Sequence, residues 1–135
     1  MRWTARHRDG FTEHLLRFDL RGAGGRVEGD ACWFQPGPGS ASCRLRFDLD
    51  EARIAAAVPA LRLMDEAYAA GWTDMDDRTL TVEVDGEAIR RHAYGAGVLV
   101  ADRPELRPFV ELFDWLEAEV LARLPAGAAP AAGRR

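Results

Sequence analysis

The period of apolar and polar positions along the chain is two in several separate segments. The pentapeptide LRFDL occurs at residues 16–20 and again at residues 45–49. In each copy two leucines and a phenylalanine alternate with an arginine and an aspartate, so one face of an extended segment is apolar and the other is charged. This pattern predicts two strands of an antiparallel sheet, each with one buried face. Because the sequences around the copies differ, we interpret the pentapeptide as a recurrent strand pattern and not as a duplicated module.

Residues 11–20 also fit a second pattern. Phe11, Leu15 and Phe18 have the i, i+4, i+7 spacing of one helix face, and Thr12 is a suitable N-cap. We favour the strand, because the glycine-rich segment 22–25, which we interpret as a loop, follows directly and leaves no room for a long helix.

Two hairpins are expected. In the first, strands at residues 31–34 and 42–47 are joined by residues 35–41, whose Pro-Gly-Pro-Gly centre is a strong turn signal. This connection is long for a hairpin, so we expect a projecting loop.

The second hairpin has the clearer signals. Residues 79–84 are β-branched and alternating, and Asp85-Gly86 after them suits a type I′ turn, which needs positive φ at both central positions. The return strand runs from residue 87 to about 94, and residues 98–100 add a short strand.

Two segments have helical spacing of apolar residues. The first begins at Asp48 or Asp50 and is expected to run to about Ala70. Pro59 lies inside it, so the helix either kinks there or is divided into two short helices.

The second helix begins near Asp102, whose spacing to Glu105 is that of a capping box, and runs to about Leu124. Its apolar face comprises Phe109, Phe113, Leu116 and Val120, widened by Leu112, Trp115 and Leu121.

Together these elements predict an α+β fold. We expect an antiparallel sheet of about five or six strands, with a central proline-interrupted helix and a long C-terminal helix packed on one face. The chain of 135 residues has the size of one domain, which we assign to residues 1–124. Residues 125–135 are rich in Ala, Gly and Pro, and we expect a flexible tail there.

Composition and charge narrow the classes of partner. No apolar run approaches the length of a membrane span and no signal peptide is visible, so we expect a cytoplasmic protein without a membrane partner. All 18 basic residues are arginine, as is typical of a GC-rich bacterial genome. The net charge of −4 comprises +3 in residues 1–47, −8 in residues 48–89 and +1 in residues 90–135. The acidic middle argues against nucleic-acid binding, and the N-terminal surplus is too small to indicate it.

Cys32 and Cys43 are the two cysteines. They form a disulfide only if the hairpin register places them opposite each other, and a shift of one or two residues opposes Trp33 or Phe34 to Cys43 instead. We favour two free thiols, with a disulfide as the alternative, because isolated cysteines of cytoplasmic proteins are mostly reduced. Their number and spacing do not fit a zinc site.

No pattern of catalytic residues is apparent. The histidines His7, His14 and His92 are scattered, and the acidic segment 74–77 lacks the glycine and the terminal glutamate of a calcium loop. We therefore expect no catalytic residue, metal or cofactor. As an alternative, a small enzyme or ligand-binding domain would place Asp74, His92 and Tyr94 in a cleft between helix and sheet.

The function that we favour is a non-catalytic protein-interaction module, such as an inhibitor, an immunity-type protein or a regulatory partner. Four tryptophans are many for this length, and buried aromatic anchors dominate interface energetics. The residues that we expect to bind the partner are Trp33, Pro36, Gly37, Pro38 and Trp115. The expected partner is another protein or a second copy of the chain in a homodimer.

Overall fold

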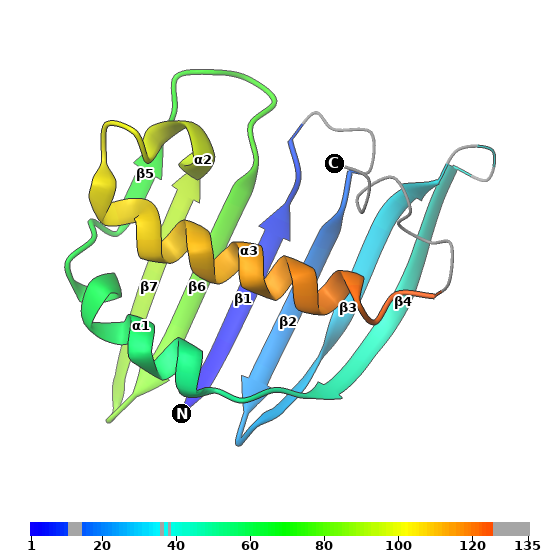
Figure 1. Cartoon of the computed structure of the whole chain (residues 1–135), viewed down its shortest axis with the longest axis horizontal. Coiled ribbons are helices and arrows are strands. Elements are labelled where there is room, and N and C mark those ends of the chain that lie inside the picture. Colours follow the sequence, from blue (N-terminus) through cyan, green and yellow to red (C-terminus); the bar gives the residue numbers. More distant parts are fainter. Residues whose placement is uncertain (11–14, 36, 38, 126–135) are drawn as a thin grey trace.

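Seven strands form one sheet, and two helices lie across one of its faces (Figure 1). The computed structural model describes residues 1–10, 15–35, 37 and 39–125. In chain order the elements are β1 (Arg2–Arg8), β2 (Arg17–Ala23), β3 (Arg26–Gln35), β4 (Gly39–Asp48), α1 (Ala52–Arg62), β5 (Ala67–Ala69), β6 (Asp77–Val84), β7 (Glu87–Tyr94), α2 (Ala96–Leu99), the 3-10 helix η1 (Pro104–Leu106) and α3 (Arg107–Leu121).

The strand order is β4-β3-β2-β1-β6-β7-β5, and every neighbouring pair is antiparallel except β5 and β7. The N-terminal strand therefore lies inside the sheet. Strands β2 to β4 extend the sheet from one edge of β1, and the strands that follow α1 extend it from the other (Figure 1). The α+β class and the mostly antiparallel sheet are confirmed, but the prediction of five or six strands was too low.

Two strands were missed in the sequence, for different reasons. In β1 the inward positions are Trp3, Ala5 and His7, and only the first is a strongly apolar residue. Strand β5 has three residues and lies inside the segment predicted to be helical. It forms because residues 67–69 pair in parallel with β7, which is a long-range contact that local periodicity does not reveal.

The core lies between the inner face of the sheet and the helices α1 and α3. Both copies of LRFDL contribute to it as strands: Leu16, Phe18 and Leu20 are each 1% exposed, and Leu45 is 3% exposed. From α3 the buried side chains are Phe109, Leu112, Phe113, Leu116 and Val120. The strand interpretation of residues 17–20 is thus confirmed, whereas residues 11–14, on which the helical alternative partly depended, lie outside the described residues.

Helix α1 is shorter than predicted. It contains Pro59 and ends at Arg62, not near Ala70. The backbone N–H of Asp65 donates to the hydroxyl of Tyr68 at 2.9 Å, and this hydroxyl donates to Glu105 at 3.1 Å. Burial is the main cause that raises the pKa of Tyr68, and the hydrogen bond to Glu105 acts in the same direction. The segment after α1 is thereby tied to the start of the C-terminal helical region.

Two further local predictions were wrong. Residues 98–100 do not form a strand, because Gly95 has φ 77° and a helical turn, α2, starts after it. The predicted capping box is also absent: η1 has no side-chain cap hydrogen bond, and Glu105 accepts from Tyr68 instead.

The two hairpins differ in how closely they follow the prediction. Asp85 and Gly86 have φ of 52° and 76°, which confirms the turn between β6 and β7. Strands β3 and β4 continue further than predicted, so their connection is residues 36–38 and not 35–41. The segment 22–25, which we interpreted as a loop, is in part a strand, because β2 extends to Ala23. The missing side chain of Gly22 leaves room for the indole of Trp3.

The register of β3 and β4 separates the two cysteines. Cys43 is opposite Ala31 and faces the core, whereas Cys32 is opposite Ser42 and faces away from it. Both are free thiols, so the disulfide alternative was wrong. In the described ranges no helix has both the length and the apolar character needed to cross a membrane.

Candidate functional site

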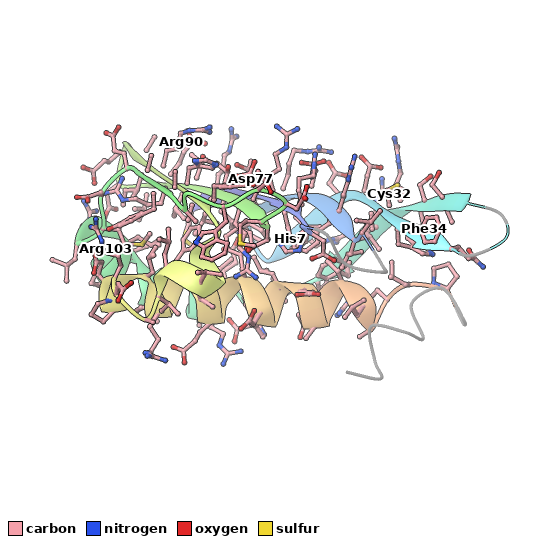
Figure 2. The ribbon with its side chains drawn as sticks, turned by 90° about the horizontal axis from the view of Figure 1, so that it is seen from above. His7, Cys32, Phe34, Asp77, Arg90 and Arg103 are labelled. Carbon is pink, nitrogen blue, oxygen red and sulfur yellow. The ribbon has the colours of Figure 1, made fainter. Side chains whose placement is uncertain are left out.

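One whole face of the sheet is not covered by a helix. In Figure 2 the helices lie below the sheet, and the side chains of Arg90 and Asp77 project on the opposite side. We call this surface the open face and define it by the outward charged residues of the strands. Its nine arginines are Arg2, Arg6, Arg8, Arg17, Arg21, Arg26, Arg44, Arg46 and Arg90. Its six carboxylates are Asp19, Glu28, Asp30, Asp48, Asp77 and Glu83.

Two carboxylates of the open face are each shared between two arginines. Asp19 pairs with Arg6 at 3.6 Å and with Arg8 at 3.0 Å. Glu28 likewise lies between two arginines, Arg21 at 3.7 Å and Arg46 at 3.8 Å. Each of these exposed pairs contributes little to stability, because water screens the charges. The face has a positive surplus because it carries nine arginines and six carboxylates.

Three arginines of the open face have no carboxylate partner among the described residues. They are Arg2 on β1, Arg17 on β2 and Arg90 on β7, and all three are exposed. A guanidinium group without a carboxylate partner can form charge-assisted hydrogen bonds to acidic groups of a binding partner.

The open face is hollowed in places. One depression of about 610 Å³ includes Arg2, Arg21 and Arg26 in its lining. A second, of about 650 Å³, lies over β1, β6 and β7 and includes Arg90 and His92. The second is lined mainly by polar surface, so it suits charged groups of a partner, whereas the surface that lines the first is mainly apolar.

The alternative ligand site falls on the open face and not in a cleft between helix and sheet. His92 and Tyr94 are outward residues of β7. His92 Nε2 contacts the carboxylate of Asp77, and the hydroxyl of Tyr94 accepts from the backbone N–H of Met75 at 3.1 Å. Asp74 is exposed in the preceding loop with φ 58°. The structure thus brings His92 together with Asp77 and not with Asp74.

The predicted aromatic anchors lie elsewhere than expected. Trp33 is 4% exposed in the core, so it is not available to a partner. Trp115 is half-buried, with the guanidinium carbon of Arg53 5.1 Å from its ring centre. Gly37 is exposed with φ 95°. Pro36 and Pro38 lie outside the described residues.

Besides Trp72, which is 68% exposed in the loop between β5 and β6, Phe34 is an exposed aromatic residue that the sequence pattern did not single out. It is 43% exposed and belongs to the outward side of β3, at the end next to the connection 36–38. The signal was present in the sequence, because adjacent residues of a strand point to opposite faces and only one of Trp33 and Phe34 can enter the core.

A second polar group lies on the covered side of the sheet. His7 is 1% exposed between the sheet and α3 (Figure 2), and its ring stacks on Phe18 with centroids 4.9 Å apart. Its Nε2 is 2.8 Å from Oδ1 of Asp9. A ligand atom of Glu117 on α3 completes a set of three atoms that lie within 4.8 Å of one another, which is close enough to converge on a metal ion.

The hydrogen bonds of this group fit a structural role better than a metal centre. Asp9 Oδ2 accepts from the backbone N–H of Leu16 at 3.0 Å, and the N–H of Asp9 donates to the carbonyl of Leu16 at 2.9 Å. When Nε2 of His7 carries the proton and donates to Asp9, its Nδ1 is a bare acceptor. Coordination through Nε2 would move the proton to Nδ1, which has no hydrogen-bond partner among the described residues. We therefore interpret His7 and Asp9 as a latch that closes the β1–β2 connection.

Comparison with known proteins does not assign this chain to a family. No protein-family model matches it, and no curated protein is similar enough to match.

Proposed function

We propose that this chain is a non-catalytic protein-interaction module, of the inhibitor, immunity-type or regulatory class, and that it binds its partner on the open face. The observation that carries the proposal is that helices cover only one of the two faces of the sheet. Both long helices pack on one face, and the other presents nine arginines and six carboxylates to solvent.

The size of the open face supports a protein partner. Seven strands spaced about 4.8 Å apart give a width of about 29 Å. Strands of seven or eight residues, such as β1, β2, β6 and β7, extend for about 25 Å. The resulting flat area is about 700 Å². Its accessible surface is larger because side chains project from the sheet, so the face can supply the roughly 800 Å² that each partner contributes to a standard protein–protein interface.

An aromatic anchor at the rim adds support. Phe34 lies at one end of the open face, beside the connection 36–38 that we expected to take part in binding. Removal of an exposed aromatic ring from water by a partner is favourable, because the ring buries a large apolar area. Phe34 takes the role first assigned to Trp33.

An enzymatic or ligand-binding function has less support. The residues that would form its site, Asp74, His92 and Tyr94, do not converge between helix and sheet. Two of them, His92 and Tyr94, lie on the open face, so they are available to a protein partner.

A substitution that adds bulk without changing charge tests the proposal. Thr81 lies on β6 near the centre of the open face, opposite Thr4 on one side and Arg90 on the other. We expect Thr81→Trp to reduce capture of partner proteins from an extract of the native host by about tenfold or more, because the indole prevents close approach over the face. Quantitative mass spectrometry of the captured proteins measures the effect.

The matched control is Ala56→Trp, which adds the same side chain to an exposed position of α1. It should retain capture, and circular dichroism should show that both variants are folded. If Thr81→Trp captures as much as the unsubstituted chain, while Ala56→Trp loses capture, the binding surface is on the helical side and the proposal is wrong.

A further inference from the structure

The three arginines without carboxylate partners are too far apart for one small anion. In the register of the sheet Arg17 on β2 is opposite Arg8 on β1, and Arg8 is six residues from Arg2. Arg2 and Arg17 therefore lie about 20 Å apart along the strands. Arg90 is on β7, two strands from β1, at the level of Thr4. It is therefore about 12 Å from Arg2 and about 20 Å from Arg17. A single carboxylate or phosphate does not reach all three, so a ligand that engages them carries several separate anionic groups.

The carboxylates on the same face argue against a nucleic acid. A phosphate backbone is negative throughout, and it would meet Glu83 beside Arg2 and Asp77 beside Arg8. The exposed or half-buried rings on this face, Phe34 and Tyr94, lie on β3 and β7 with three strands between them, so they do not form a continuous platform for stacked bases. A protein surface can place carboxylates against the arginines and basic or neutral groups against the acids.

The rest of the chain has the opposite charge. Outside the open face the described residues include fifteen carboxylates and seven arginines. A partner with a negative surface is therefore repelled by the remainder of the molecule and attracted to the open face, which favours a productive orientation before contact.

From these observations we infer that the partner presents a carboxylate-rich protein surface, and that Arg2, Arg17 and Arg90 bind its separate acidic side chains. This inference rests on the proposed function and adds the chemistry of the partner. Each contact would be a charge-assisted hydrogen bond between a guanidinium group and a carboxylate, which is bidentate where the geometry allows.

Fluorescence anisotropy with a labelled polyglutamate peptide of about 20 residues tests the inference, because that length offers many carboxylates over the span of the face. At low salt the peptide should bind, and a polyglutamine peptide of the same length should not. Raising the ionic strength from about 0.05 M to about 0.3 M should weaken binding by about tenfold, since exposed charges are then screened. The triple variant Arg2→Gln, Arg17→Gln, Arg90→Gln should weaken binding by about tenfold or more.

The control variant Arg53→Gln, Arg103→Gln, Arg107→Gln removes the same charge from exposed positions outside the sheet. It should bind polyglutamate like the unsubstituted chain. Equal losses in the two triple variants, or equal binding of polyglutamate and polyglutamine, would overturn the inference. So would tighter binding of a single-stranded oligonucleotide of about 20 nucleotides, which would identify a general polyanion site.

Two other results separate this inference from the proposed function. If the open-face triple variant still captures the partner that Thr81→Trp loses, the binding face is correct and the acidic chemistry is wrong. If light scattering shows a dimer that only the open-face triple variant dissociates, the occupant is the acidic remainder of a second copy, and the inference of a separate acidic partner is overturned.

Discussion

At the scale of single residues, Asp9 shows how one carboxylate organises a chain connection. It accepts a hydrogen bond from His7 within β1 and another from the backbone of Leu16, just before β2. Neither residue stands out in the sequence as part of a pair, because scattered histidines and aspartates are common. His7 pairs with Asp9 because the alternation of β1 turns the histidine side chain inward. Stacking of the imidazole ring on Phe18 holds the ring in this position.

The latch predicts the effect of a minimal substitution. Asp9→Asn keeps the size of the side chain but leaves one oxygen for two donors, and it turns an amide N–H₂ toward one of them. We expect the free energy of unfolding to fall by about 1–2 kcal/mol, as is usual when a hydrogen bond to a charged group is lost in a mostly buried site. Urea denaturation followed by circular dichroism measures it.

Asp85→Asn is the matched control. Asp85 has φ 52° in the β6–β7 turn, a conformation that asparagine adopts readily, so the free energy of unfolding should change by less than about 0.5 kcal/mol. Equal stabilities of Asp9→Asn and Asp85→Asn would contradict the role of Asp9.

At the scale of secondary-structure elements, the sequence predicted strands better than it predicted their partners. The alternation in β4, β6 and β7 and the turn at Asp85-Gly86 are local signals, and the structure confirms them. The register between β3 and β4 is not local, because an apolar pattern of period two fits several shifts. Strand β5 depends on β7, and the end of α1 depends on contacts of Tyr68, so neither was visible in the sequence.

The register makes a prediction about the two cysteines. Burial, and to a smaller extent the negative charge of Asp30, raises the pKa of Cys43, so less of this thiol is ionised at pH 8. Cys32 faces the side without helices. We expect iodoacetamide to alkylate Cys32 several-fold faster than Cys43, as measured by peptide mass spectrometry of the folded chain.

Unfolding in urea is the control, since the two rates should then become similar. Equal rates in the folded chain, or a peptide in which Cys32 is joined to Cys43 after mild oxidation without denaturant, would show that the register is different.

At the scale of the whole molecule, charge is separated by face as well as by segment. Along the sequence the surplus of residues 1–47 is only +3, which we interpreted as too small to indicate nucleic-acid binding. Eight of the nine arginines of the open face nevertheless come from this segment. They gather because each occupies a polar position of an alternating strand, and β1 to β4 are neighbours in the sheet. Periodicity could have placed each arginine on the polar side of its own strand. The strand order that unites them was not predictable from local patterns.

The most direct test of the open face as the binding surface is arginine footprinting with phenylglyoxal. The chain has no lysine, so no side-chain amine competes for the reagent. Modification is measured by mass spectrometry with and without polyglutamate at low salt. We predict that reactivity falls about threefold or more at Arg2, Arg17 and Arg90, where carboxylates bind, and stays constant at the exposed residues Arg53, Arg103 and Arg107. Equal protection of both groups, or protection of the second group alone, would contradict the account.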